Sequence, residues 1–128
     1  MILGGDGIDT VTTGDGNNII RVGNGANTVT TGAGVDQVYT GVDIDTITSG
    51  AGDDEIHILG GTDTITAGAG TDTLFVDFSA AAGAVTMSAL AGTASAGYAG
   101  NISGIGVATF AGVENFDITS GSFNDVIT

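Results

Sequence analysis

Large aliphatic residues recur every nine residues along the first part of the chain. Residues 4–75 divide into eight consecutive nonapeptides without an insertion or deletion, and position 8 of each is aliphatic. These residues are Val11, Ile20, Val29, Val38, Ile47, Ile56, Ile65 and Leu74. Because side chains alternate across a strand, the three residues that end each nonapeptide predict a short strand, with position 8 facing inward and positions 7 and 9 facing outward.

Glycine dominates the six residues before each predicted strand. Position 2 is Gly in every nonapeptide except at Leu59, and position 4 is Gly except at Asp43. Since Gly adopts positive φ without steric penalty, these segments predict tight turns. Two repeats then make one coil of strand, turn, strand and turn, so we expect about four coils closing two sheets on a thin core. The glycines are Gly5, Gly14, Gly23, Gly32, Gly41, Gly50 and Gly68 at position 2, and Gly7, Gly16, Gly25, Gly34, Gly52, Gly61 and Gly70 at position 4.

Position 6 always carries a short side chain with an oxygen atom. Stacking of residues 18 apart places these side chains in two ladders, one along each edge of the coils, with rungs ~4.8 Å apart. One ladder is Asp9, Asn27, Asp45 and Asp63, and the other is Asn18, Asp36, Asp54 and Asp72. Each could be a turn former only, but anions at this spacing repel each other, and a divalent cation between rungs removes the repulsion. Oxygen ligands favour Ca²⁺ over Mg²⁺, and soft metals lack Cys or clustered His.

The nonapeptides follow the template G-G-x-G-x-D-x-U-x, where U is a large aliphatic residue, and resemble the calcium-binding repeats of the RTX family. The resemblance implies an all-β fold, a right-handed parallel β-roll. It also implies that each ion takes one position-6 side chain from each of two successive rungs, together with backbone carbonyls of the turn. Up to six Ca²⁺ sites follow: Asp36/Asp54, Asp54/Asp72 and Asp45/Asp63 with two carboxylates, and Asp9/Asn27, Asn27/Asp45 and Asn18/Asp36, where one ligand is neutral and binding is weaker.

Four residues of the repeats affect these expected sites. Asp6 and Asp15, at position 3 of the first two repeats, add charge near the sites that contain Asn. Leu59 and Asp43 replace glycines beside the Asp45/Asp63 pair, so we expect altered geometry there.

The net charge of the chain limits the classes of partner that it can bind. Fifteen acidic residues and one basic residue give a formal net charge of −14, which argues against nucleic acid and anionic membrane surfaces and favours cations. The chain has no Cys, so disulfides cannot stabilise it, and no apolar run approaches the ~20 residues of a membrane span. With few large apolar residues, folding needs a further stabilising agent, and bound calcium would supply it.

The two sheet faces differ in composition. One bears Thr at positions 7 and 9 of four repeats, a grid that resembles the ice-binding face of some β-solenoid antifreeze proteins, although Thr is also favoured on any exposed strand. The other bears Ile19, Arg21, Tyr39, His57 and Phe75. We expect this second face to pack against the C-terminal segment or another subunit. His57 lies near Glu55 as a surface residue, and no catalytic set of residues occurs, so no enzymatic activity is expected.

The nine-residue phase ends after Phe75, which predicts a β-roll over residues 1–75 and an irregular, β-rich spacer or capping segment over residues 76–128. Residues 76–90 predict two strands or a short helix, and residues 91–101 a mobile loop. Residues 107–128 alternate in a strand-like manner and resemble RTX spacers that lead back into a repeat. Asp125–Thr128 fit positions 6–9 of a resumed repeat, or the end of a type I secretion signal, and Met1–Leu3 fit positions 7–9 of a preceding repeat.

Three functions remain open. The first is a calcium-binding structural module of a secreted surface protein, such as an S-layer, adhesin or extracellular filament. The second is the C-terminal secretion and folding module of an RTX enzyme or toxin, and the third is an ice-binding solenoid. We favour the first, because both chain ends fit open solenoid phases and one face carries exposed apolar residues. It implies secretion to the cell surface and head-to-tail or lateral self-association.

Overall fold

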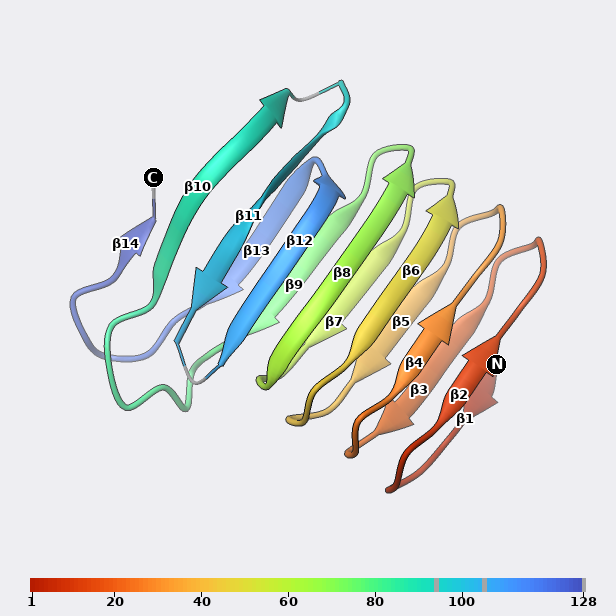
Figure 1. The fold of residues 1–128 in the computed structure, drawn as a ribbon, viewed down its shortest axis with the longest axis horizontal. Helices are drawn as coiled ribbons and strands as arrows, with labels where there is room; N and C mark the ends of the chain where they lie inside the picture. Colours follow the sequence, from red (N-terminus) through yellow and green to blue (C-terminus); the bar gives the residue numbers. More distant parts are fainter. Residues whose placement is uncertain (94, 105, 128) are drawn as a thin grey trace.

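The computed structural model describes residues 1–93, 95–104 and 106–127, and regular secondary structure in this part of the chain is entirely β (Figure 1). No helix in it is long and apolar enough to cross a bilayer. A 6-stranded sheet has the order β1-β3-β5-β7-β9-β13, and an 8-stranded sheet has the order β14-β10-β11-β12-β8-β6-β4-β2. The strands are β1 (Ile2–Leu3), β2 (Thr10–Thr12), β3 (Ile19–Gly23), β4 (Thr28–Thr30), β5 (Gln37–Thr40), β6 (Thr46–Ala51), β7 (Glu55–Ile58), β8 (Thr62–Ala69), β9 (Thr73–Asp77), β10 (Thr86–Thr93), β11 (Gly97–Ser103), β12 (Val107–Val113), β13 (Asn115–Thr119) and β14 (Val126–Ile127).

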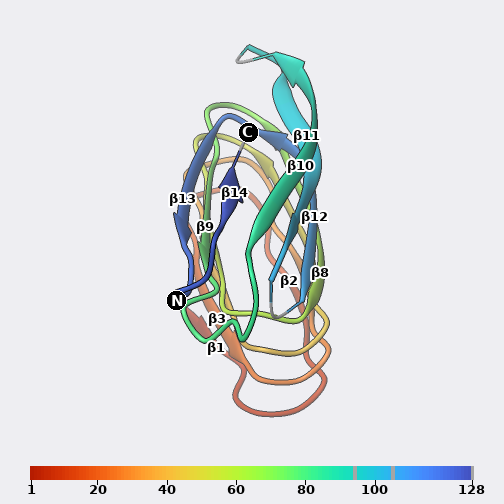
Figure 2. The same ribbon diagram turned by 90° about the vertical axis from the view of Figure 1, so that its left-hand side faces the viewer.

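Strands 18 residues apart pair in parallel throughout the repeats. Ile20 pairs with Val38 in one sheet, and Val29 pairs with Ile47 in the other. From β1 to β9, the odd-numbered strands therefore stack in one sheet and the even-numbered strands in the other, and the turns between them close each coil into a flattened oval (Figure 2). The predicted parallel β-roll, with two nonapeptides per coil, is confirmed.

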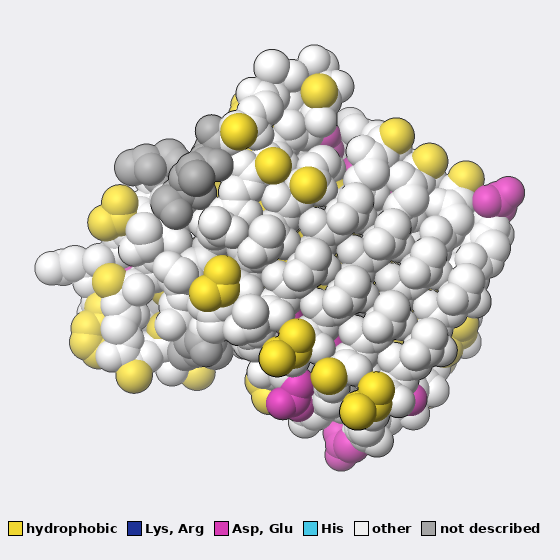
Figure 3. All heavy atoms as spheres, viewed as in Figure 1, with side chains coloured by type: hydrophobic (Ala, Val, Ile, Leu, Met, Phe, Trp, Pro, Cys, Tyr) yellow, Lys and Arg dark blue, Asp and Glu magenta, His cyan; other side chains and the backbone are white. Residues whose placement is uncertain are grey.

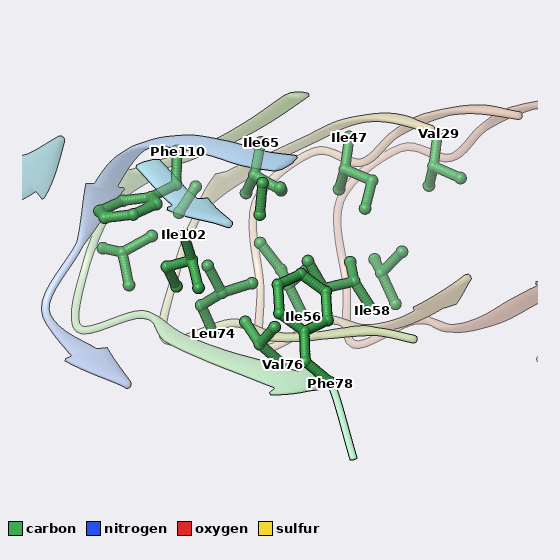
Figure 4. Packing of buried hydrophobic residues seen from close by; sticks show 14 of the residues in the cluster. Val29, Ile47, Ile56, Ile58, Ile65, Leu74, Val76, Phe78, Ile102 and Phe110 are labelled. Atoms are coloured by element: carbon green, nitrogen blue, oxygen red, sulfur yellow. The ribbon is translucent and has the colours of Figure 1, made fainter. Parts of the chain in front are cut away.

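The interior is a thin layer of aliphatic side chains between the two sheets. The position-8 residues from Ile20 to Leu74 are at most 1% exposed, whereas Val11 in the first coil is only partly buried. Figure 4 shows Val29, Ile47 and Ile65 of one sheet facing Ile56 and Leu74 of the other. Burial of one such side chain contributes about 1.5–3 kcal/mol, so a layer of this thickness supplies limited stability.

Position 1 of the repeats also faces inward, which the alternation of the predicted strands did not indicate. Val22, Ile58 and Ala67 belong to the core, and Thr31, Thr40 and Ser49 are buried beside it. The Ser49 hydroxyl donates to the Ala67 carbonyl at 2.9 Å, and the Thr31 hydroxyl donates to the Ser49 carbonyl. The Ser49 and Thr31 hydroxyls therefore bridge successive coils, whereas the buried Thr40 hydroxyl has no hydrogen-bond partner among the described residues.

The C-terminal segment continues the stack. β12 pairs in parallel with β8, and β13 pairs in parallel with β9, so one further coil follows the repeats. β10 and β11 form an antiparallel hairpin that pairs with β12, and β14 runs parallel to β10. Residues 76–90 complete β9 and enter β10, which agrees with two strands and excludes the short helix. Thr128, the last residue of the expected resumed repeat, lies outside the described residues.

The mobile loop predicted over residues 91–101 is wrong. Gly92 pairs with Tyr98 and Ala91 with Ala99 across the β10–β11 hairpin, although Ala94 lies outside the described residues. The small residues permit close backbone packing, since a Cβ on Gly97 would lie 2.4 Å from the Cα of Gly112. Pairing with β12 thus orders a segment whose composition by itself indicates a loop.

The C-terminal segment extends the sheet that bears Arg21, Tyr39, His57 and Phe75 through β13 and does not lie over this face, so packing against another subunit, the other expected arrangement, stays a prediction. The guanidinium carbon of Arg21 lies 3.8 Å from the Tyr39 ring centroid, and the His57 ring stacks at 4.3 Å on Tyr39 and at 4.2 Å on Phe75. In-register strands hold outward side chains at a spacing that suits stacked rings. The four side chains thus form a stacked column, in which each ring covers part of the apolar surface of its neighbour.

The opposite face is a flat grid of threonines. Pairs such as Thr28 with Thr46 and Thr48 with Thr66 lie opposite each other in the register of β4, β6 and β8. Figure 3 shows this face as regular ridges of uncoloured side chains, with hydrophobic and acidic side chains at its margins. The array predicted from the sequence is therefore continuous and outward-facing.

Candidate calcium sites

The position-6 side chains form two hydrogen-bonded ladders. In each step, one side-chain oxygen accepts the backbone N–H of the position-6 residue one coil earlier. On one edge Asp36, Asp54 and Asp72 accept from Asn18 (2.7 Å), Asp36 (2.8 Å) and Asp54 (2.9 Å). On the other edge Asn27, Asp45 and Asp63 accept from Asp9, Asn27 and Asp45, each at 2.9 Å. The structure therefore brings together every pair of residues that the sequence predicted.

The second oxygen of each ladder carboxylate has no partner. Among the described residues, the Oδ2 atoms of all the ladder aspartates are buried and accept no hydrogen bond. A buried, unpaired carboxylate oxygen is costly, so these atoms require a cation or a proton. The aspartates are Asp9, Asp36, Asp45, Asp54, Asp63 and Asp72; all but Asp9 are at most 1% exposed.

The contacts of the Asn18 amide show which oxygen atoms surround a position-6 side chain. Its Nδ2 donates to the carbonyls of Gly14 (3.3 Å) and Gly16 (2.7 Å) and lies 3.1 Å from Oδ1 of Asp36. The carbonyls belong to positions 2 and 4 of its own turn, and the carboxylate belongs to the next rung. Where position 6 is Asp, a carboxylate oxygen stands in place of the Asn Nδ2. The space next to it is then lined by oxygen atoms only: those of the two carboxylates and of the turn carbonyls. Such an all-oxygen cage fits Ca²⁺.

Asn27 repeats this arrangement on the other edge. Its Oδ1 faces the rung below, toward the N–H of Asp9, and its Nδ2 donates to the Gly23 carbonyl at 3.3 Å. One atom of a position-6 side chain thus contacts the earlier coil, and the other contacts its own turn. By equivalence, the unpartnered Oδ2 of each aspartate faces the carbonyls of its own turn.

The turn glycines hold successive coils close together. A Cβ on Gly52 would lie 2.1 Å from the Gly34 carbonyl oxygen, and one on Gly25 would lie 1.9 Å from that of Gly7. Both residues have positive φ, of 130° and 113°. Position 4 therefore requires Gly for conformation and for space. The predicted site glycines line these stacked turns through their backbone.

The two departures from the template keep this backbone arrangement. A Cβ on Gly61 would lie 2.0 Å from the Asp43 carbonyl oxygen, so Asp43 keeps its carbonyl in the position-4 stack. Its carboxylate accepts the N–H of Gly25 at 2.9 Å. Leu59 is 47% exposed and points away from the core. Of the charges added at position 3, Asp15 accepts the N–H of Ala33 at 3.0 Å.

No three acidic, His or Cys side chains gather into a metal-binding cluster in the described part of the chain. Each candidate site instead offers two rungs of a ladder and backbone carbonyls. This donor set suits Ca²⁺, which accepts carbonyl oxygens readily, better than a metal that selects nitrogen or sulfur.

Burial raises the pKa values of several ladder carboxyl groups. It raises the pKa of Asp63 to about 7 and that of Asp72 to about 6, and neighbouring ladder carboxylates add to both shifts. Burial also raises the pKa values of Asp45 and Asp54. Backbone N–H donors oppose these shifts but do not cancel them. Without a cation the folded ladder therefore favours protonation.

A calcium-free chain is expected to contain more β-structure at pH 5 than at pH 8. The folded-state pKa values of Asp63, about 7, and Asp72, about 6, lie above the ordinary value of 3.8. Between pH 3.8 and about 7 the folded state binds more protons than the unfolded state, so stability falls as pH rises. Far-UV circular dichroism in calcium-free buffer measures the effect, on the order of a few kcal/mol.

Charge neutralisation of the whole chain could also favour folding at low pH, and a pair of variants separates the two causes. Asp63→Asn should flatten the pH dependence, whereas Asp6→Asn, which removes an exposed charge, should leave it unchanged. Equal pH profiles for the two variants would contradict a role for the buried ladder.

Sequence reasoning missed Glu114. This residue immediately precedes β13, and its Oε2 accepts the N–H of Asp72 at 2.8 Å, as a ladder residue does. The signal available in the sequence was an acidic residue within the strand-like alternation of residues 107–128, but the nine-residue phase had already ended.

Comparison with protein families agrees with this geometry. The family model described as the RTX calcium-binding nonapeptide repeat (4 copies) matches residues 3–38, 30–62 and 39–74, which together span more than half of the chain. No curated protein and no solved structure matches the chain. The family is a structural repeat that binds calcium, and its fold is the β-roll. The chain belongs to the RTX calcium-binding nonapeptide-repeat family.

Proposed function

We propose that residues 1–75 are a β-roll that folds when Ca²⁺ binds between the rungs of its two ladders, and that residues 76–128 cap it. The observation that carries this proposal is the row of buried Oδ2 atoms without a partner. A divalent cation at each rung would satisfy two such carboxylates and offset their repulsion, which is about 4 kcal/mol at 4 Å and an effective dielectric of 20.

The ladders favour four ions rather than six. At the Asn18/Asp36 pair the amide of Asn18 occupies the position that a cation would take, and at the Asn27/Asp45 pair the amide of Asn27 contacts its own turn. An N–H donor there satisfies carbonyl oxygens without a metal. The remaining pairs keep an unpartnered Oδ2 on the earlier rung: Asp9/Asn27, Asp36/Asp54, Asp45/Asp63 and Asp54/Asp72.

The role we propose is structural: a module of a secreted surface protein such as an S-layer, adhesin or filament. RTX repeat proteins are typically secreted by the type I route, which suits a chain that folds on meeting extracellular calcium. Leu3, in β1, and Ile8, which precedes β2, are 65% and 82% exposed and support head-to-tail or lateral self-association at the first coil. A secretion and folding module of an RTX enzyme or toxin remains the alternative.

Calorimetric titration tests the proposal. We expect about four Ca²⁺ ions in the two ladders of residues 1–75, with affinities near 10⁻⁴–10⁻³ M, the range of extracellular modules, and weaker binding of Mg²⁺. Light scattering of the same samples should show larger particles only in calcium. Absence of calcium binding would refute the function, whereas calcium binding by a strict monomer would refute only the self-association.

The threonine face supports a second candidate function. Its in-register pairs, such as Thr28 with Thr46, form an exposed, regular lattice on β2, β4, β6 and β8. Such a surface could order water against an ice lattice. Thermal hysteresis of the calcium-loaded chain would reveal this activity, and its absence would leave the threonines as exposed strand residues.

A further inference from the structure

The ladder formed by Asn18, Asp36, Asp54 and Asp72 does not end with the repeats. The N–H of Asp72 donates to Oε2 of Glu114 at 2.8 Å, in the way that Asp54 donates to Asp72 at 2.9 Å. The Asp72 carbonyl accepts the N–H of Asn115 at 2.9 Å, as the Asp54 carbonyl accepts that of Thr73 at 2.8 Å. Glu114 therefore occupies position 6 of the coil that follows the repeats.

A glutamate suits this place because the turn before it is short. Ala111 pairs with Thr66 and Asn115 with Thr73, so three residues connect these positions where the preceding coil has six. Glu has one methylene more than Asp, which lets the Glu114 carboxylate reach the N–H of Asp72 although the shorter turn follows a different course. Gly112 still lies over the preceding turn, since a Cβ there would be 3.1 Å from the Gly68 carbonyl oxygen.

The Oδ2 atom of Asp72, on the side of the coil that contains Glu114, is buried without a hydrogen-bond partner. Asp72 is 0% exposed, its Oδ1 accepts the N–H of Asp54, and its Oδ2 has no partner. By equivalence with Asn18 and Asn27, this Oδ2 faces the carbonyls of its own turn and the next rung. The carboxylates of Asp72, which is fully buried, and Glu114 are therefore neighbours on this edge, and a cation between them would offset their repulsion.

The other ladder ends differently. Ala108 pairs with Asp63 in the register of β8 and β12, so no carboxylate stands on the next rung. The N–H of Val107 donates to the Gly61 carbonyl at 2.8 Å, and this carbonyl belongs to position 4 of the Asp63 turn. The C-terminal segment thus closes one ladder with backbone groups and extends the other with an acid.

We propose that Asp72 and Glu114 hold an additional Ca²⁺ ion, which fastens the C-terminal segment to the end of the β-roll. The ligands are Oδ2 of Asp72, the carboxylate of Glu114 and carbonyl oxygens of the turn at residues 67–72. The inference rests on the proposed calcium binding by the ladders, and it adds a site outside the nonapeptide repeats. The ion would make docking of β13 depend on calcium.

Calcium stoichiometry of the whole chain tests the inference. Wild type is expected to bind about five ions, and Glu114→Gln, which keeps an acceptor for the Asp72 N–H but removes the charge, is expected to bind one fewer. The matched control is Asp117→Asn, which removes an exposed carboxylate from the same strand, β13, and should bind as wild type does.

The outcomes separate this inference from the proposed function. If wild type binds no calcium, both fail. If wild type and Glu114→Gln bind the same number of ions with the same affinities, the additional site is refuted and the ladder sites stand. Circular dichroism in saturating calcium checks that Glu114→Gln folds. If it does not fold, the wild-type count decides, because four ions contradict the additional site and five support it.

Discussion

Removal of calcium is expected to unfold the repeats over residues 1–75. The chain carries a net charge of −14 around a thin core, and the buried Oδ2 atoms lack any protein partner. At ~1 mM free calcium and a Kd near 10⁻⁴ M, each ion contributes about 1.4 kcal/mol, so four ions contribute roughly 6 kcal/mol. This is comparable with the lower end of the stability of a typical domain, about 5–15 kcal/mol.

Circular dichroism measures this effect directly. The β-signal should be largely lost in excess chelator at pH 8 and should appear on titration to ~1 mM Ca²⁺. Equal concentrations of Mg²⁺ serve as the control for general screening of charge, and they should restore much less of the signal. An identical β-signal in chelator and in calcium would show that the ions are not needed for folding.

Asp54→Ala is expected to raise the calcium concentration at half-folding several-fold more than Asp9→Ala. Asp54 lies between Asp36 and Asp72 and serves two proposed ions, and it is 1% exposed. Asp9 serves one ion in the first coil, where its partner, Asn27, is neutral. We expect a difference of at least ~1 kcal/mol in linked stability.

Calcium titrations of the two variants, followed by circular dichroism, test this prediction. Both substitutions remove an Asp from the position before a strand, so loss of turn propensity alone would shift the two midpoints equally. Asp54→Asn is an additional control, because an amide oxygen can still accept the N–H of Asp36, as Asn27 does for Asp9. It should lose calcium affinity with a smaller loss of folding than Asp54→Ala at saturating calcium.

Much of the candidate site could be predicted because the information is periodic and local. A nine-residue phase without insertions sets which residues lie 18 apart, and parallel pairing then places Asp36, Asp54 and Asp72 on one edge without further assumptions. The number of ions that we propose was harder to predict. It depends on the contacts of the Asn18 amide, whose Nδ2 donates into its own turn, and these contacts are visible only in three dimensions.

The sequence by itself determined the repeat: the strands, their register, the inward aliphatic layer and the two ladders, since a steric rule acts identically in each nonapeptide. Only the tertiary structure decided how the chain continues beyond residue 75. Strand pairing there joins residues 42 and 45 positions apart, such as Asn115 with Thr73 and Val107 with Thr62, and no periodicity encodes these separations. For the same reason the sequence did not indicate that Glu114 reaches Asp72, or that the C-terminal segment extends the sheet bearing Tyr39 and His57 instead of lying over it. Both features depend on where a non-repeating segment finds free strand edges and space to pack, which local propensity does not specify.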